Sequence, residues 1–118
     1  MPVTFFRIAA GFCFLAVALG AFGAHALKAT LQNQGMLDVW NKAVLYHFLH
    51  AIALMVISLN AVGNRIAFYL LATGILFFSG TLYALAISNV RWLGAITPIG
   101  GLCFLAGWAW LIISPLKP

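Results

Sequence analysis

Three histidines carry most of the chemistry that this sequence can offer. A neutral imidazole can bind a metal ion or a haem iron, carry a proton, or hydrogen-bond a small molecule. His47 and His50 are three residues apart, so both lie on one face if the segment is a helix. Asp38 is the only carboxylate side chain in 118 residues, which excludes carboxylate-pair catalysis and a proton exchanger built on a buried acid.

Hydroxyl groups accompany the histidines within apolar stretches. Tyr46 directly precedes His47, and Ser79 and Tyr83 are one helical turn apart. Thr97 comes before Pro98, a pair that predicts the start of a regular helix near this point. We predict that the interior of the protein gathers these groups into one polar cluster. Its members are His25, Tyr46, His47, His50, Ser79, Tyr83 and Thr97.

Such a cluster has two main interpretations. It can bind or pass a small polar molecule, an ion or a lipid headgroup, and a cavity lined by these side chains is then expected. Alternatively, the side chains only hydrogen-bond one another and staple the helices of a structural or assembly subunit, and no void is then expected. The presence or absence of a cavity therefore distinguishes binding from stapling.

Haem or metal binding by the histidines is a lesser alternative, because helical bundles can supply axial imidazoles. We expect no cysteine or carboxylate near the histidines, which disfavours zinc, and we expect no cofactor. Catalysis is not expected either. Ser79 would need an activated hydroxyl, and the sequence has neither a G-x-S-x-G elbow nor an acidic residue to orient a histidine.

The elements that carry these residues are transmembrane helices. Hydrophobic residues make up 65% of the chain and charged residues 6%, whereas soluble domains average about 25% charged residues. Four apolar runs approach the roughly 20 residues that span a bilayer, and their short links make successive spans antiparallel. We predict an all-α integral membrane protein, an up-down bundle of four transmembrane helices in a single domain over residues 1–118. The predicted helices are about 5–27, 39–60, 66–87 and 93–114.

Both termini of such a bundle lie on one side of the membrane, here called the terminal side. The polar cluster falls in the half of the membrane toward the opposite side. Six basic residues stand singly at the ends of apolar runs, three on each side, so the positive-inside rule gives no orientation. They form no basic stripe, and nucleic-acid binding is not expected. The terminal side has Arg7, Arg65 and Lys117, and the opposite side has Lys28, Lys42 and Arg91.

The first apolar run also has features of a secretory signal peptide. Arg7 precedes the apolar stretch, and Ala24, His25 and Ala26 together form an A-x-A-like cleavage site. We expect this run to be retained as the first helix of the membrane domain.

Small residues recur along three of the runs. Ala16, Gly20 and Ala24 are four residues apart, a spacing that lets helix backbones approach closely in lipid. We predict that such ridges pack the helices together. We also predict that they support a homodimer, a homotrimer or a larger membrane complex within the lipid bilayer. The packing residues are Ala16, Gly20, Gly23, Ala24, Gly80, Gly100, Gly101 and Gly107.

Several segments resemble one known family. They are residues 20–28 (GAFGAHALK), 46–51 (YHFLHA), 78–83 (FSGTLY) and 93–101 (LGAITPIGG), followed by Gly107-Trp108. In this order they are similar to the small four-helix membrane proteins of unknown function that include bacterial YgdD and YwdK and animal transmembrane protein 256. The resemblance implies a multi-pass protein of the bacterial cytoplasmic membrane, with animal relatives in the mitochondrial inner membrane. It implies no particular activity.

Overall fold

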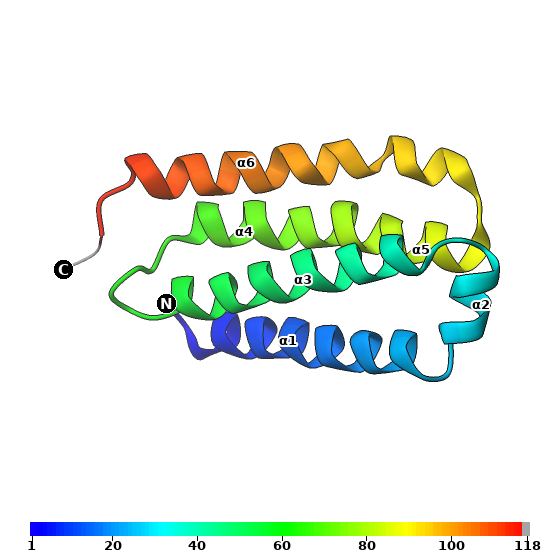
Figure 1. Cartoon of the computed structure of the whole chain (residues 1–118). Coiled ribbons are helices and arrows are strands. Elements are labelled where there is room, and N and C mark those ends of the chain that lie inside the picture. The colour runs from blue at the N-terminus through cyan, green and yellow to red at the C-terminus, as the bar shows by residue number, and fades with distance from the viewer. Residues whose placement is uncertain (117–118) are drawn as a thin grey trace.

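The computed structural model describes residues 1–116, so Lys117 lies outside the described residues. Within them the chain forms helices and no strand. Four helices are long and apolar enough to cross a membrane, and Figure 1 shows them running up and down with both termini at one end. The predicted all-α class with four transmembrane helices is confirmed. These spans are Val3–Ala24, Leu37–Ile57, Arg65–Ser88 and Arg91–Ile113.

The third and fourth spans each change geometry along their length. The third begins as α4 (Arg65–Gly74), widens into the π-helical turn η1 (Ile75–Ser79) and continues as α5 (Gly80–Ser88). A π-turn inserts an extra residue into a helix, so the side chains beyond it face a different direction from those of an unbroken α-helix. The fourth opens with the 3-10 turn η2 (Arg91–Ala95) and continues as α6 (Thr97–Ile113), whose start matches the predicted one.

The first two spans are the continuous helices α1 (Val3–Ala24) and α3 (Leu37–Ile57). Between them lies a short helix that was not predicted, α2 (Lys28–Asn33), across the end of the bundle away from the termini (Figure 1). Leu31 of α2 is fully buried. The Gln34 side-chain amide donates hydrogen bonds of 2.9 and 3.2 Å to two carbonyls at the end of α5. Because such carbonyls have no partner within their own helix, α2 and Gln34 close this end of the third span.

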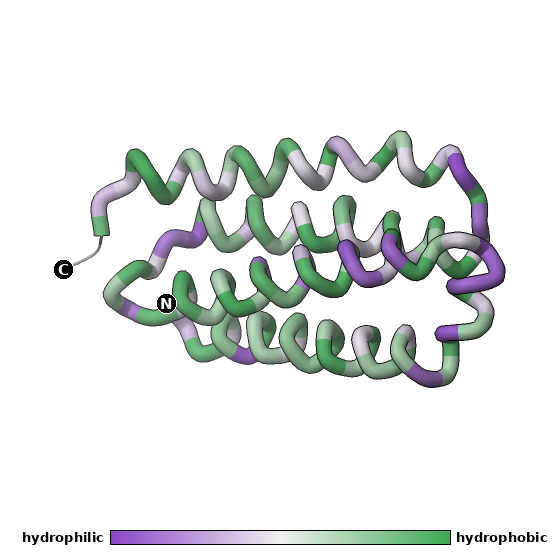
Figure 2. The backbone as a smooth tube through the Cα atoms, in the orientation of Figure 1, coloured by the Kyte–Doolittle hydropathy of each residue, from purple (hydrophilic) through white to green (hydrophobic). Residues whose placement is uncertain are grey.

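The spans pack on one another in a simple order. α1 packs on α3, α3 packs on the third span, and the third span packs on α6, so α1 and α6 lie at opposite edges (Figure 1). The Cα trace measures 51 × 26 × 17 Å, a flattened bundle. Figure 2 shows hydrophobic residues along most of the spans, and hydrophilic residues at the turns and in the half of α3 nearer α2. Because α1 makes almost no backbone contact with η1 and α5, space is left between them beside α3.

Two helix pairs approach each other most closely, and glycine makes both approaches possible. Where α1 lies on α3, a Cβ atom at Gly23 would overlap the indole of Trp40. Where α6 lies on α4 and η1, a Cβ atom at Gly100 would overlap the backbone of η1, and one at Gly107 would overlap the side chain of Leu71. In lipid such close packing is a main source of helix association.

The other predicted packing residues differ in the space around them. Ala16 is fully buried, and Gly20 faces α3. Gly80 and Gly101 have room for a Cβ atom, and Ala24 is exposed. The tightest small-residue contacts are therefore made within the chain.

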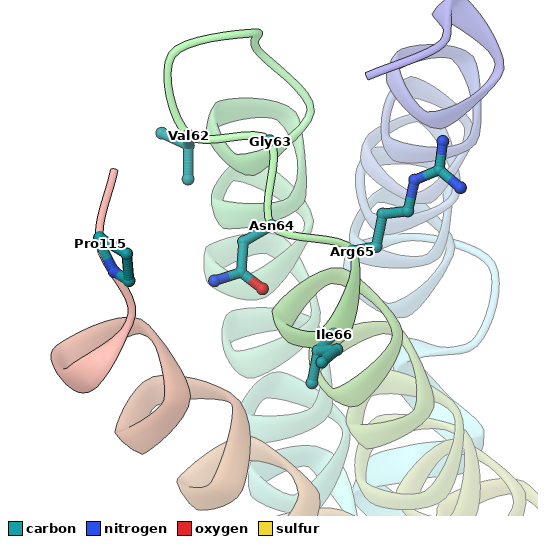
Figure 3. A pocket seen from close by; sticks show the side chains of 6 residues that line it. All are labelled: Val62, Gly63, Asn64, Arg65, Ile66 and Pro115. Atoms are coloured by element: carbon teal, nitrogen blue, oxygen red, sulfur yellow. The ribbon is translucent and has the colours of Figure 1, made fainter. Parts of the chain in front are cut away.

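A shallow pocket of about 270 Å³ lies on the terminal side, at the link between α3 and α4. Asn64 caps α4, since its side-chain oxygen accepts a hydrogen bond from the Ala67 amide at 3.0 Å. Figure 3 shows Arg65 turned away from this pocket, and its guanidinium carbon lies 5.5 Å from the centre of the Phe5 ring. Both polar side chains thus anchor helix ends. The pocket is lined by Val62, Gly63, Asn64, Arg65, Ile66 and Pro115 (Figure 3).

Candidate binding site

The seven candidate residues do not share one site. His25 is exposed just beyond the end of α1, where it borders a shallow apolar groove on the outer surface. The other six are buried or half-buried within the bundle. Ser79 has no hydrogen-bond partner, and the others face different helices. His47 and His50 illustrate this, because a separation of three residues turns them about 60° apart around α3. That angle is enough for His47 to face α5 and for His50 to face α6.

His50 links α3 to α6, and both of its ring nitrogens have hydrogen-bond partners. Its Nδ1 lies 2.7 Å from the carbonyl oxygen of Tyr46, and because a carbonyl only accepts, Nδ1 carries the hydrogen. Nε2 therefore accepts the hydrogen bond that the Trp108 indole donates at 3.0 Å. The imidazole also stacks on Phe104, with 3.7 Å between ring centres. Both nitrogens of this 6%-exposed ring are thus occupied.

Thr97 and Tyr46 also join helices. Thr97 Oγ1 lies 2.8 Å from Thr81 Oγ1, and the Thr81 hydroxyl lies 2.7 Å from the Phe77 carbonyl oxygen. Because one hydroxyl donates only one hydrogen, Thr81 donates to that carbonyl and accepts from Thr97. The Tyr46 ring is 40% exposed and packs on Phe78, with 4.8 Å between ring centres. These contacts link α6 and α3 to the third span.

His47 differs from His50 because only one of its nitrogens is occupied. It is the middle residue of α3 and is 3% exposed. Nδ1 lies 2.8 Å from the Tyr83 hydroxyl, which joins α3 to α5. Nε2 is buried and has no hydrogen-bond partner within ordinary distance and angle limits, although a backbone group of Phe12 on α1 lies beside the ring. An unpaired buried polar atom costs about 1–3 kcal/mol and is rare in folded proteins.

A cavity of about 160 Å³ lies beside His47, and we call it the His47 crevice. Side chains of α1 form one wall and side chains of η1 and α5 form the other. His47 and Tyr83 also border the crevice, but neither exposes a polar atom in it. Two rim residues, Leu15 and Leu76, are 50% and 59% exposed and lie within the spans, so the crevice opens sideways to lipid. The apolar walls are Phe12, Leu15 and Leu19 on one side and Ile75, Leu76 and Gly80 on the other.

Ser79 is the second buried polar side chain with an unpaired atom. It is the last residue of η1 and is fully buried, and its Oγ has no hydrogen-bond partner. Among residues 1–116, the buried side-chain polar atoms without a partner are His47 Nε2 and Ser79 Oγ. Ser79 directly precedes Gly80 but does not itself line the crevice, so only the histidine atom belongs to a residue that borders a cavity.

The three histidines face different parts of the structure. In the described part of the chain, no group of three His, Cys, Asp or Glu side chains lies close enough to hold an ion. His50 would have to give up the bond from Trp108 before its Nε2 could ligate iron. His25 lies at the end of α1, away from the middle of α3. The arrangement therefore gives no support to haem or metal ligation.

Three residues that make hydrogen bonds between helices were not assigned such roles from the sequence. They are Trp108, Thr81 and Trp40, whose indole donates to the Leu19 carbonyl of α1 at 3.0 Å. The signal that would have found them is a hydrogen-bonding atom within an otherwise apolar span. The sequence does not show which neighbouring helix each of them faces.

Known proteins resemble this chain along most of its length. A family model described as a protein of unknown function, DUF423, matches residues 19–101. A UPF0382 membrane protein of Staphylococcus haemolyticus is 48% identical over 107 residues, 87% of each chain. The UPF0382 membrane protein YwdK of Bacillus subtilis is 40% identical, over 87% of this chain and 88% of its own. A UPF0382 membrane protein of Schizosaccharomyces pombe is 39% identical, over 94% of this chain and 100% of its own. No solved structure matches the chain.

Proposed function

We infer that this chain, which belongs to the DUF423 family and whose relatives are named membrane proteins, binds a small lipophilic molecule in the His47 crevice. Its membership confirms the resemblance drawn from the sequence, and the family description supplies no activity. The observation that carries the proposal is a cavity with an apolar surface that lies beside the buried His47 and opens to lipid within the spans. An apolar group that fills this cavity gains the dispersion contacts that its walls otherwise lack.

The size and lining of the crevice limit what it can hold. An apolar cavity of about 150 Å³ is large enough for a benzene ring and stays free of water. The crevice has about 160 Å³, so a ring-sized group fits it. An ion is disfavoured because no carboxylate lines the walls to balance its charge. The ligand we propose is therefore apolar, in contrast to the polar molecule, ion or lipid headgroup expected from the sequence.

The proposed role is binding without catalysis. Tyr83 and His47 are the only polar groups in the lining, and they are bonded to each other. No serine, cysteine or carboxylate lines the crevice to act as a nucleophile or to orient the imidazole. The ligand enters from the bilayer between α1 and the third span, since the rim leucines are exposed there.

The histidines themselves can report binding. Protein labelled with ¹⁵N-histidine and purified in detergent is titrated with acetophenone, a ring-sized molecule with one carbonyl. We expect the His47 ring signals to shift and saturate, while those of the exposed His25 do not. No saturable shift at His47 would contradict the proposal.

A matched pair of variants locates the probe. Gly80→Leu places a side chain in the crevice wall, and a Cβ atom there meets only a carbonyl oxygen at 4.0 Å, so the helix accepts it. Gly101→Leu is the control, because its Cβ has similar room, 3.9 Å from Phe78, and lies outside the crevice. Binding should be lost in the first variant and kept in the second. Equal binding by both variants would place the probe elsewhere.

A structural or assembly role is the second candidate, and the satisfied hydrogen bonds favour it. The bonds from Trp40, Trp108 and Thr97 each join one span to another, as expected for staples. We propose that a homodimer, homotrimer or larger complex forms in the bacterial cytoplasmic membrane through surfaces other than the tight glycine contacts. Cross-linking in native membranes tests this, and a species that stays monomeric there would exclude it.

A further inference from the structure

A second hollow lies between the last turns of α3 and α6, in the half of the bundle that carries the termini. We call it the α3–α6 groove, and its volume is about 330 Å³. Its walls are apolar side chains, and the indole nitrogen of Trp108 already donates to His50. The groove therefore offers a ligand mainly apolar contact. Its lining residues are Ala53, Val56, Ile57, Val62, Trp108, Leu111 and Leu116.

The α3–α6 groove is short and lies near the membrane boundary. Ala53 is four residues before the end of α3 at Ile57, and Trp108 is five residues before the end of α6 at Ile113. At 1.5 Å per residue these distances are about 6 and 8 Å, within a half-layer of hydrocarbon that is roughly 15 Å deep. The volume of the groove is about twice the roughly 150 Å³ that holds a benzene ring. The groove therefore suits the part of an acyl chain next to its headgroup.

A polar pocket adjoins the α3–α6 groove. It is the terminal-side pocket of about 270 Å³ at the link between α3 and α4. Val62 lines both hollows, and Pro115 of the pocket is followed in the chain by Leu116 of the groove. Figure 3 shows the Asn64 amide at the pocket, with its nitrogen on the side of Pro115. An apolar hollow within the spans thus continues into a polar hollow at their end, which is the pattern of a single amphiphilic ligand.

The Asn64 amide gives this pocket a hydrogen-bond donor. Its oxygen accepts from the Ala67 amide at 3.0 Å, so the nitrogen, which carries two hydrogens, faces away from that helix turn. No acidic side chain lines the pocket, and the single carboxylate side chain of the sequence, Asp38, lies at the start of α3, at the other end of the bundle. A phosphate group accepts such hydrogen bonds strongly. The pocket therefore suits the phosphate end of a lipid.

Neither hollow would select a lipid by itself. An acyl chain in the bilayer is already surrounded by hydrocarbon, so it gains no hydrophobic free energy by entering the groove. The gain must come from close packing against a fixed wall, together with a hydrogen bond at the polar end. Trp108 supplies such a wall, because its ring is 43% exposed while its nitrogen is held by His50.

We propose that the α3–α6 groove and the adjoining pocket together bind one phospholipid of the terminal-side leaflet. The first part of an acyl chain packs on Val56 and Trp108, and the phosphate accepts a hydrogen bond from Asn64 Nδ2. The site is distinct from the His47 crevice, which lies between α1 and the third span. Its occupancy therefore does not depend on the proposed function.

Native mass spectrometry of the full chain in detergent tests the ligand class. The protein is titrated with dioleoyl phosphatidylglycerol and, separately, with dioleoylglycerol, which has the same chains and no phosphate. We expect one phosphatidylglycerol to bind at least about tenfold more tightly than any further copy and than dioleoylglycerol, the effect of a hydrogen bond to a charged group. Equal binding of the two lipids, or no single tight copy, would overturn the proposal. Oleate that binds as tightly would replace the phospholipid by a fatty acid.

A matched pair of variants locates the lipid. Val56→Trp fills the groove from its rim, where Val56 is 50% exposed, so the fold accepts the larger side chain. Val17→Trp is the control, because Val17 is 60% exposed on α1 and lies outside the groove. The affinity for the first phosphatidylglycerol should fall about tenfold in the first variant only. Equal affinities would place the lipid elsewhere, and a loss in Gly80→Leu would place it in the His47 crevice.

Two substitutions at Asn64 test the phosphate contact. Asn64→Asp keeps an oxygen that can cap α4 but replaces the donor by a negative charge, whereas Asn64→Ser keeps a capping oxygen without the charge. Asn64→Asp should weaken phosphatidylglycerol binding about tenfold or more and leave dioleoylglycerol binding unchanged, and Asn64→Ser should have a smaller effect. Unfolding followed by circular dichroism checks that α4 is intact. Unchanged phosphatidylglycerol binding by Asn64→Asp would show that the phosphate does not lie at Asn64, and the proposal would fail.

Discussion

The two buried histidines of α3 are three residues apart, but they differ in how many of their ring nitrogens have hydrogen-bond partners. His50 faces α6, where a carbonyl and an indole occupy both of its nitrogens. His47 faces the space between α1 and the third span, where a tyrosine occupies one nitrogen and the other has no partner. The same type of side chain, similarly buried, thus has hydrogen-bond partners at both ring nitrogens in one position and at only one in the other.

The cause of the difference lies in the neighbouring helices. α6 is held close to α4 and η1 because Gly100 and Gly107 allow near contact of the backbones, and this places Trp108 beside His50. α1 is held on α3 by Gly23 and almost does not touch η1 and α5. Space therefore remains next to His47 and not next to His50. The positions of these glycines therefore decide which histidine has hydrogen-bond partners at both ring nitrogens.

The largest effect is expected from Gly100→Val. A Cβ atom at Gly100 would overlap the backbone of η1, which cannot move aside as a side chain can. The substitution should push α6 away from the third span and break the Trp108–His50 hydrogen bond. The free energy of unfolding should therefore fall by about 3 kcal/mol or more. Unfolding in detergent followed by far-UV circular dichroism measures the loss. Gly101→Val is the control, since a Cβ there meets only Phe78 at 3.9 Å. Equal losses would mean that the close approach at Gly100 does not matter.

The next largest effect is expected at the satisfied histidine. Trp108→Phe leaves the Nε2 acceptor of His50 buried and unpaired, at a cost of about 1–2 kcal/mol. His50→Phe combined with Trp108→Phe should recover part of this loss, because no unpaired group then remains. The same unfolding experiment gives the coupling energy of the pair. A coupling near zero would show that the bond does not link α3 to α6.

A smaller effect is expected when the unsatisfied pair is removed. His47→Phe with Tyr83→Phe deletes both partners of one hydrogen bond and also the unpaired Nε2. Replacing both partners by apolar rings is nearly neutral or stabilising, so the free energy of unfolding should change by less than about 1 kcal/mol. A loss as large as that of Trp108→Phe would mean that His47 is a staple like His50.

The spans could be predicted from sequence because a bilayer requires about 20 apolar residues whatever their order. Two elements could not be predicted. α2 has six residues, too few to be stable alone, and depends on burial of Leu31 and on the bonds from Gln34. The π-turn η1 adds one residue to a helix in a stretch that is apolar on all sides, so no periodicity reveals it.

The candidate site was predictable only as a set of residue types. His47, His50, Ser79 and Thr97 stand out because a polar group within a span needs a partner. Their grouping depended on the rotation of each helix about its axis, and uniformly apolar spans carry little information about that rotation. The spacing of His47 and His50 placed them on one face of α3, yet a turn of about 60° between them is enough to give them different neighbours.

The smallest effect is expected at the third histidine, which is exposed and lies in neither of the environments of His47 and His50. His25 follows the last residue of α1 and is exposed, next to a shallow groove on the outer surface of that helix. His25→Ala removes no interaction between spans, so the free energy of unfolding should change by less than about 0.5 kcal/mol. The affinity for acetophenone should stay unchanged, because the His47 crevice lies beside the middle of α3. A His25→Ala variant with altered affinity would show that the ligand reaches along α1 to its far end, and the crevice would then be only part of a longer site.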